Sequence, residues 1–117
     1  MQQWDVGSVP IVDDGGRLIG LCTDRDIVVR LLALNLSPQT AVSDIMSTDL
    51  HTAQPDDDLE FIEQLMERFQ VRRVPIVNDQ NVLVGFISTA DLARHAPRDI
   101  EEHEVAAVFE SVSQLKY

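Results

Sequence analysis

The chain has 117 residues, a length that suits one compact domain with its own hydrophobic core. Its net charge of −11, from 20 acidic and 9 basic residues, excludes nucleic acids and anionic membrane surfaces as expected partners. A single cysteine, no secretory leader and no apolar run of about 20 residues favour a cytoplasmic protein without disulfides.

The first predicted elements form a strand–turn–strand unit followed by a helix. Val9–Val12 is a short apolar strand, and Pro10 suits the beginning or the edge of a sheet. Asp13–Gly16 is typical of a hairpin turn, because its residues tolerate positive φ. A second strand at Leu18–Cys22 and a helix that begins at Thr23–Asp26 complete the unit.

The next elements are a strand and a longer helix. Leu50–Gln54 is predicted as a short strand that Pro55 stops. A helix capped by Asp56 or a neighbour is expected to reach about Phe69. Its apolar residues recur with a helical period at Leu59, Ile62, Leu65, Met66 and Phe69.

A second strand–turn–strand–helix unit closes this series. Strands at Val74–Val77 and Leu83–Ile87 flank a turn at Asn78–Asn81. The following helix is expected to begin at Ser88–Asp91.

The end of the chain predicts a separate amphipathic helix from Ile100 to Leu115, beyond Pro97. Such a helix must bury its apolar face against its own body, a second subunit or a partner protein. The face comprises Val105, Val108, Phe109, Val112 and Leu115.

An internal repeat decides the organisation of the chain. At a constant offset of 65, residues 1–27 match residues 66–92 without a gap and with ten identities, where average composition gives about two. Cys22 aligns with Ile87, which predicts a small buried side chain rather than a reactive thiol. Because Met1 aligns with Met66 in mid-helix, the first copy in this chain lacks its opening strand and most of its first helix.

Both copies carry the pattern V-P-h-V, a turn, and G-h-h-[ST]-x-x-D, where h is apolar. Asp44-Ile45-Met46-Ser47, followed by Thr52-Ala53-Gln54-Pro55, leads into the second copy. This duplicated β-α-β-β-α unit resembles the CBS domain pair, or Bateman module, over residues 1–96. The chain is further similar to small stand-alone bacterial members of that family.

The resemblance implies an α+β fold of two motifs related by a pseudo-twofold axis, with two clefts and commonly a homodimer. It divides the chain into a truncated first motif with its linker at 1–43, a second motif at 44–96 and the terminal helix at 97–117. It also implies a regulatory, non-enzymatic module whose clefts hold AMP, ADP, ATP or another adenosyl ligand such as S-adenosylmethionine, and sometimes nothing.

Recognition of an adenosine phosphate needs two kinds of group, and both copies offer them. A carboxylate accepts the two hydroxyl protons of a ribose diol, as in dinucleotide folds. Hydroxyls, backbone N–H groups and guanidinium groups bind phosphate. Thr23 with Asp26, and Ser88 with Asp91, are therefore predicted to face the phosphate and the ribose. Adenine is expected against the V-P-I-V strand and the segment that opens the same motif.

The predicted binding residues of the second motif are Ser47, Thr48, Leu50, Thr52, Arg72, Arg73, Val74, Pro75, Ile76, Ser88 and Asp91. Those of the first and weaker site are Ser8, Val9, Pro10, Ile11, Thr23, Arg25 and Asp26. The second site is expected to be stronger because Arg72 and Arg73, the only adjacent basic pair, align with Gly7 and Ser8.

Each of these assignments has a simpler alternative. The Thr-x-x-Asp and Ser-x-x-Asp patterns also match helix capping boxes, which need no ligand. The V-P-I-V residues can be core, and the two arginines can be solvated partners of nearby acids such as Glu67.

Two other classes of function compete with ligand sensing. A structural dimerisation module with empty clefts would be compatible with the same sequence. NAD is an alternative ligand within the sensing function. A redox or metal sensor is disfavoured because His95, Glu101, Glu102 and His103 are interrupted by Pro97. No nucleophile–base pair predicts catalysis, so neither a metal nor an enzymatic cofactor is expected; the effector protein that would receive the signal is unknown.

Overall fold

The structure is a computed structural model that describes residues 1–3 and 6–95. These residues form two compact units, of which the first is Met1–Leu50 and the second begins at His51. The expected boundary between the motifs was seven residues earlier, before Asp44. The predicted terminal helix at 97–117 lies outside the described residues.

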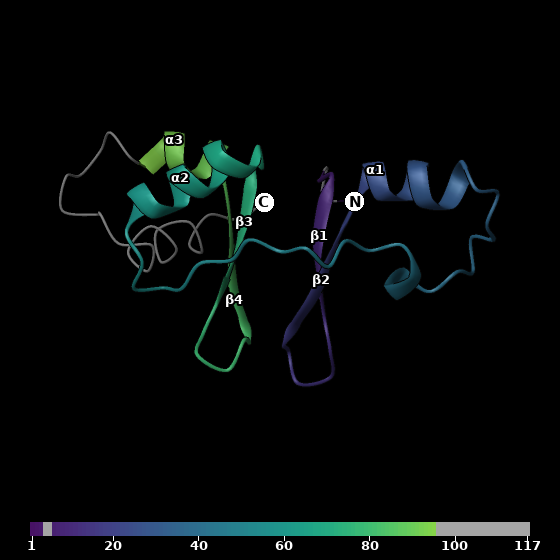
Figure 1. Cartoon of the computed structure of the whole chain (residues 1–117), viewed down its shortest axis with the longest axis horizontal. Helices are drawn as coiled ribbons and strands as arrows, with labels where there is room; N and C mark the ends of the chain where they lie inside the picture. The colour runs from purple at the N-terminus through teal and green to yellow at the C-terminus, as the bar shows by residue number, and fades with distance from the viewer. Residues whose placement is uncertain (4–5, 96–117) are drawn as a thin grey trace. The chain divides into compact units, whose positions relative to one another are not determined.

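The first unit is a hairpin that runs into a helix. Strand β1 (Ser8–Val12) pairs antiparallel with β2 (Leu18–Thr23). Helix α1 (Asp24–Asp26) continues directly into the π-helical segment η1 (Ile27–Leu32), at the end of the hairpin opposite its turn (Figure 1). A short 3₁₀ helix, η2 (Val42–Asp44), follows.

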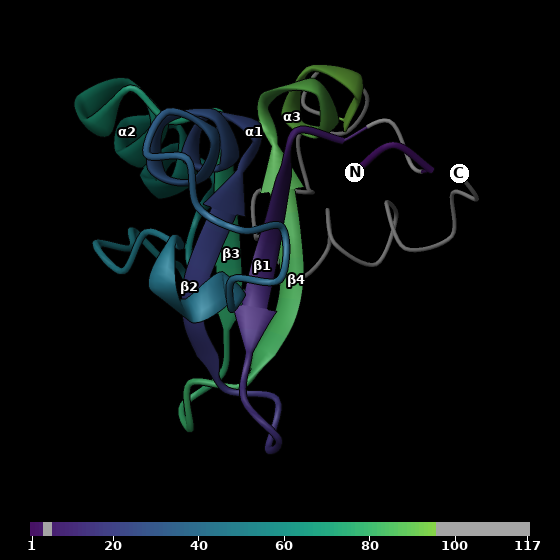
Figure 2. The same ribbon diagram turned by 90° about the vertical axis from the view of Figure 1, so that its right-hand side faces the viewer.

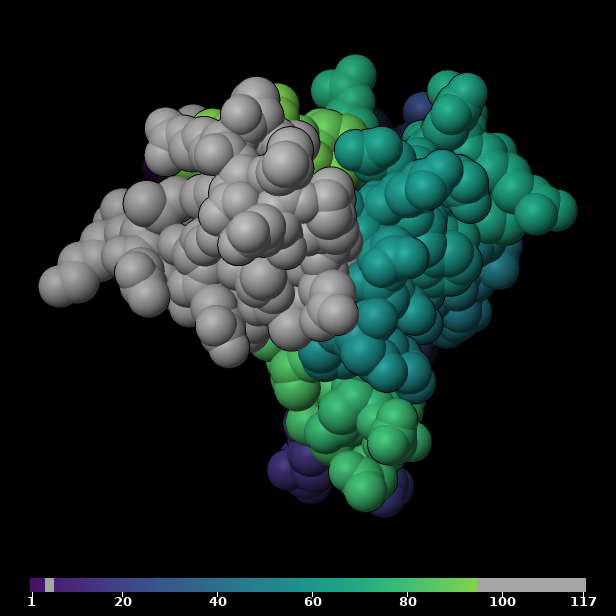
Figure 3. Space-filling view, turned by 90° about the vertical axis from the view of Figure 1, so that its left-hand side faces the viewer, coloured from purple at the N-terminus to yellow at the C-terminus, as the bar shows by residue number. Residues whose placement is uncertain are grey.

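The second unit places one helix before its hairpin and one after it. Helix α2 (Leu59–Phe69) precedes strands β3 (Arg73–Val77) and β4 (Leu83–Ser88), and α3 (Thr89–His95) follows. Figure 1 shows both helices near the end of this hairpin that is opposite its turn. In Figure 3 the turn between the strands (green) projects from the rest of the unit.

The register of the two hairpins confirms the repeat residue by residue. Val9 pairs with Cys22 in the first hairpin, and Val74 pairs with Ile87 in the second. The register shifts after Ile11 and again after the equivalent Ile76. A one-residue shift would turn every side chain to the other face, so equal registers place equivalent residues on equivalent faces.

The two hairpin turns are closed by the same side-chain hydrogen bonds. Asp13 Oδ1 accepts from the N–H groups of Gly15 (3.0 Å) and Arg17 (2.9 Å). Asn78 Oδ1 accepts from the N–H groups of Gln80 and Val82, both at 3.0 Å. Short polar side chains that bond the backbone two residues ahead stabilise such turns without tertiary contacts.

The hydrophobic core of the second unit lies between α2 and the hairpin. Ile62 and Val74 are 0% exposed, and Ile76 and Ile87 are 1% exposed. Helix α2 ends where Gln70 adopts a left-handed conformation with φ 54°, a conformation that stops helices.

Within residues 1–3 and 6–50, no helix corresponds to α2, and the equivalent surfaces of the first copy are less covered. Strand β1 has no fully buried residue, whereas four of the five residues of β3 are buried. No residue of η1 is buried, and Val28, Val29 and Leu32 are 47–62% exposed.

One predicted element is wrong and one begins later than expected. Leu50–Gln54 forms no strand; only Ala53 makes an isolated parallel bridge, with Ile76. Helix α2 begins at Leu59 because Asp57 instead accepts a hydrogen bond from the N–H of Gln54 at 2.7 Å. This turn around Pro55 occupies the residues that would otherwise have extended the predicted strand at 50–54 or helix α2.

Within residues 1–3 and 6–95, no helix combines the length and the hydrophobicity that crossing a membrane requires.

Candidate functional site

Four of the predicted binding residues of the second copy lie where its hairpin meets α3: Arg72, Arg73, Ser88 and Asp91. Arg73 pairs with Ser88 across the hairpin, and the carbonyl of Arg72 accepts a hydrogen bond from the N–H of Thr89 at 2.9 Å. The equivalent bond in the first copy joins Asp24 to Gly7, also at 2.9 Å. Each junction between a hairpin and the following helix therefore places a hydroxyl residue, Thr23 or Ser88, beside the first turn of that helix.

Asp91 lies at this corner and is already hydrogen-bonded. Its Oδ2 accepts from the N–H of Ser88 at 2.8 Å, and its own N–H donates to Ser88 Oγ at 3.1 Å. Its Oδ1 accepts from Arg94 Nη2 at 3.0 Å. Asp91 is only 4% exposed, so the capping box predicted as the simpler alternative is present.

Asp26 forms the same capping box in the first copy but differs at its second oxygen. The N–H of Thr23 donates to Oδ2 at 2.9 Å, and Thr23 Oγ1 accepts from the N–H of Asp26 at 3.0 Å. The hydroxyl of Ser47 donates to Oδ1 at 3.1 Å, and Arg30 Nε lies 3.9 Å from the same oxygen. A segment distant in sequence, rather than the helix alone, thus satisfies Asp26.

This position of Ser47 differs from the expected one. Ser47 was predicted to line the second site, but its backbone pairs with Leu21 of β2 and its hydroxyl reaches Asp26. Thr48 is exposed and Leu50 is half-buried, and both belong to the first unit, whereas Thr52 is half-buried in the second.

The V-P-I-V strands differ in how much of their surface is open. Val74, Pro75 and Ile76 are buried in the core of the second unit. The backbone of this strand also bonds to Ala53, whose N–H donates to the carbonyl of Pro75 at 3.1 Å. The equivalent residues of the first copy are half-buried: Ser8, Val9, Pro10 and Ile11.

The arginines that could bind phosphate differ in exposure. Arg72 is exposed, whereas Arg73 is half-buried and its guanidinium lies 5.8 Å from the centre of the Phe86 ring. Arg25, which was considered as a basic residue for the first site, is exposed. Sequence reasoning missed Arg30 and Arg94, although their spacing of four and three residues from Asp26 and Asp91 on a helix indicates a contact.

The comparison with protein families now decides the identity of this fold. The sequence model described as "CBS domain" matches residues 1–33 and 42–98. The chain belongs to the CBS domain family. Both copies of the repeat are CBS motifs, and the corners around Asp26 and Asp91 are equivalent positions of the two motifs.

Two curated CBS relatives illustrate the similarity. The CBS domain-containing protein YhcV of Bacillus subtilis is 48% identical over 93 residues, which are 80% of this chain and 65% of YhcV. Hypoxic response protein 1 of Mycobacterium tuberculosis is 36% identical over 113 residues, which are 96% of this chain and 76% of that protein. The chain therefore spans somewhat less than two thirds of the first of these relatives.

Solved CBS structures share the fold. Hypoxic Response Protein I, solved with two coordinated zinc ions, has a TM-score of 0.73 at 38% identity, covering 81% of this chain and 77% of that one. The CBS domain pair of MJ0100, in complex with 5-methylthioadenosine and S-adenosyl-L-methionine, has a TM-score of 0.69 at 28% identity, with coverages of 82% and 74%. The cytosolic domain of the Mg²⁺ channel MgtE in complex with ATP has a TM-score of 0.66 at 28% identity, covering 76% and 34%.

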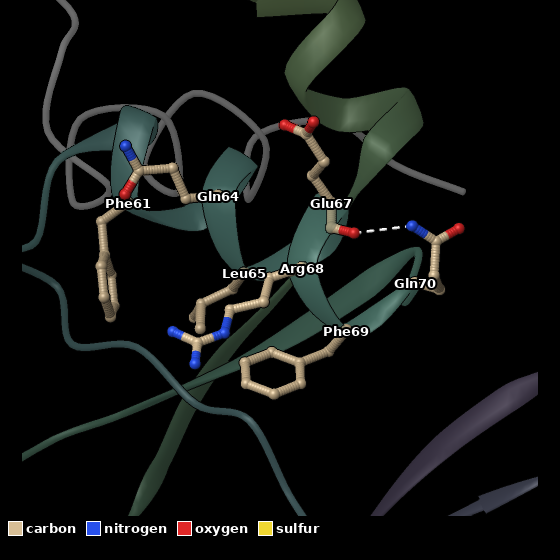
Figure 4. Close-up of a pocket in the computed structure, with 7 residues that line it drawn as sticks. All are labelled: Phe61, Gln64, Leu65, Glu67, Arg68, Phe69 and Gln70. Carbon is tan, nitrogen blue, oxygen red and sulfur yellow. Dashed lines mark hydrogen bonds between the residues drawn. The ribbon is translucent and has the colours of Figure 1, made fainter.

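The second CBS unit also carries two surface hollows, and of the predicted binding residues only Arg72 lines either of them. One of about 430 Å³ lies where α2 and α3 approach the β3–β4 hairpin, and its lining includes Met66, Arg72, Thr89 and Leu92. The other, of about 640 Å³, lies on the outer face of α2, where Phe61, Leu65 and Arg68 project to one side (Figure 4).

The histidine whose side chain is described takes part in an aromatic contact. The rings of His51 and Phe69 stack with centroids 3.7 Å apart, and Arg68 lies 5.4 Å from the same phenylalanine ring. Among residues 1–3 and 6–94, no three His, Cys, Asp or Glu side chains gather as a metal site. The residues of the disfavoured terminal metal group, His95, Glu101, Glu102 and His103, lie outside this set.

Cys22 of the first CBS motif is expected to react slowly with thiol reagents. It is 3% exposed, and burial together with the nearby Asp26 carboxylate raises the pKa of its thiol. A raised pKa leaves less of the reactive thiolate at neutral pH. Labelling at pH 7.5 should therefore be at least about tenfold slower in native than in urea-denatured protein, as followed by mass spectrometry. Equal rates in the two states would show that Cys22 is open to solvent.

Proposed function

We propose that this CBS pair is a regulatory, ligand-sensing module that binds an adenine nucleotide of the AMP, ADP or ATP class and signals through a homodimer or a partner surface. The observation that carries the proposal is the corner of the second motif. There a buried carboxylate, a hydroxyl and two arginines converge on one end of a hairpin in a chain of net charge −11. We propose no catalytic step for it.

The chemistry of the corner suits a nucleotide. Asp91 can exchange its bond to Arg94 for the two hydroxyls of a ribose, since the Arg94 side chain is 52% exposed and free to turn into solvent. Arg72 and Arg73 can then bind phosphate, which guanidinium groups grip with paired hydrogen bonds. Adenosyl ligands in the MJ0100 and MgtE structures support the same class of ligand here.

The alternative function is a structural dimerisation module with empty clefts. One observation favours it: both aspartates are buried, and both oxygens of each already interact with groups of this chain, Oδ2 in the capping box and Oδ1 with nearby side chains. S-adenosylmethionine or NAD would be alternative ligands of the same corner, because each contains an adenosine ribose.

The proposed ligand class predicts that phosphate contributes to affinity. AMP is expected to bind more tightly than adenosine by about 1.5–3 kcal/mol, the range of a charge-assisted hydrogen bond, or roughly 10- to 150-fold. Titration calorimetry with both compounds measures this difference directly. Thermal-shift scans with ADP, ATP, NAD and S-adenosylmethionine then rank the ligands, since binding to the native state raises stability.

A matched variant shows whether the arginines cause the difference. Replacing both Arg72 and Arg73 by glutamine should bring AMP down to the affinity of adenosine, whereas Arg17→Gln, in the hairpin turn of the first motif, should leave both affinities unchanged. Equal affinities for AMP and adenosine in the unmodified protein would remove the arginine pair from the site. No binding of any of these compounds would favour the structural module.

The proposed partner is a second copy of the chain. Exposed apolar side chains on helical elements of both units, including Leu32, Phe61 and Phe69, leave surface for another subunit to cover. Light scattering coupled to size exclusion should then give about twice the chain mass of 13.1 kDa. A monomeric mass at tens of micromolar protein would contradict the dimer.

A further inference from the structure

The connecting segment that leads from the first motif to the second is held on the first motif at several points. Ile45 is 5% exposed. The N–H of Ser47 donates to the carbonyl of Leu21 at 2.8 Å, and the N–H of Leu21 donates to the carbonyl of Ser47 at 2.9 Å. These bonds dock residues 45–47, the connecting segment, along β2 (Figure 2).

A glycine makes this close approach possible. A Cβ atom at Gly20 would lie 3.1 Å from the carbonyl oxygen of Ser47 and closer still to the side chain of Met46. Contacts of that kind are tighter than packed side chains normally make. The docked position is therefore a closely fitted one, rather than a loose passage of the chain over the strand.

Two side chains connect the segment to the aspartate of the first motif. Ser47 donates its hydroxyl proton to Asp26 Oδ1 at 3.1 Å, and its Oγ lies 3.4 Å from Oδ2. Arg30 Nη1 donates to the carbonyl of Met46 at 3.1 Å, while its Nε lies 3.9 Å from Asp26. The same carboxylate thus caps its own helix and holds the connecting segment.

We propose that Ser47, Arg30 and Asp26 form a latch, and that a ligand diol bound to Asp26 opens it and frees residues 45–47 from β2. This rests on the proposed function, because it assigns Asp26 to the ribose. Asp26 is 7% exposed, and the oxygen not used by the cap already faces Ser47 and Arg30. A diol that takes this oxygen must displace them, because the lone pairs of Oδ1 already face Ser47 and Arg30 and the buried site leaves no open approach.

Among the described residues, the second motif shows no such latch. Asp91 Oδ1 pairs with Arg94 of its own helix α3, so a ligand at Asp91 would displace a side chain and no connecting segment. The free energy needed to open the latch lowers the apparent affinity of the first site, because only molecules with an open latch bind the ligand there. The latch accordingly makes the first site the weaker one and couples its occupancy to the connection between the motifs.

Amide hydrogen exchange at two positions reports on the latch directly. In the full chain, saturating AMP should lower the protection of the Ser47 and Leu21 amides at least about tenfold, as expected when local structure opens. The amide of Ala53, which bonds to Pro75 in the second motif, should keep its protection. The experiment is NMR-detected exchange, with AMP binding established separately by calorimetry.

Single substitutions test the latch both without AMP and through its effect on AMP affinity. Asp26→Asn should lower the protection of the Ser47 amide without AMP, because it removes the charge that holds Ser47 and Arg30; Asp91→Asn should not. Ser47→Ala should tighten AMP binding, followed by the NMR shift of the Leu21 amide, about fivefold to tenfold. Ser43→Ala, an exposed serine in the same stretch, is the matched control.

The outcomes distinguish two failures. Calorimetric binding of AMP with unchanged protection at Ser47 and Leu21 would overturn the latch and leave the proposed function standing. Absence of AMP binding would overturn the proposed function and ligand-driven opening together. Unchanged protection of Ser47 in Asp26→Asn would overturn the latch in either case.

Discussion

Replacing Asp91 by alanine is expected to weaken the tightest AMP binding event by roughly 10- to 150-fold, the loss of about 1.5–3 kcal/mol that removal of a charge-assisted acceptor produces. The second motif should hold this event because it combines Asp91 with the exposed Arg72 and the half-buried Arg73. Titration calorimetry on the variant and the unmodified chain measures the change.

The matched variant is Asp26→Ala in the first motif. It should leave the tight event nearly intact, because Gly7 and Ser8 occupy the positions of the arginines there and the latch opposes binding. Both aspartates cap helices, so circular dichroism must show that each variant remains folded. If Asp26→Ala abolished the tight event and Asp91→Ala spared it, the assignment of the stronger site would be reversed.

Truncation of Ile62 to alanine is expected to lower the free energy of unfolding by about 2–5 kcal/mol, the range of large-to-small substitutions in a packed core. Ile62 is 0% exposed and belongs to the core cluster that includes Val74, Ile76 and Ile87. Urea denaturation followed by circular dichroism gives the change. Against a typical total of about 5–15 kcal/mol, this is a large fraction of the free energy of unfolding.

An exposed neighbour on α2 provides the control. Gln64→Ala changes a solvent-facing residue two positions along and should alter stability by less than about 0.5 kcal/mol. A loss below about 1 kcal/mol for Ile62→Ala would show that α2 does not close the core of this unit.

The hairpins and helix starts could be predicted from the sequence because short-range interactions determine them. Asp13 and Asn78 bond to backbone groups two and four residues ahead, and Thr23 and Ser88 bond to the residue three ahead. Such bonds depend on neighbouring residues alone, and each turn and capping pattern occurs in both copies of the repeat. The family followed from the same local patterns.

Only the tertiary structure decided which distant segments meet. Ser47 was expected in the second site because it precedes that motif in the chain, yet pairing with Leu21 and Asp26 places it on the first. The predicted strand at 50–54 reduces to one bridge at Ala53, since a strand needs a partner that no local pattern specifies.

The unequal burial of the two motifs has the same origin. Val9 and Val74 are identical residues at equivalent positions of paired strands, but Val74 is buried beneath α2 and Val9 is only half-buried. The sequence by itself determined the repeat, its turns, its caps and its family. Burial and long-range contacts were decided by tertiary packing, because the free energy of a side chain depends on what covers it as well as on its own identity.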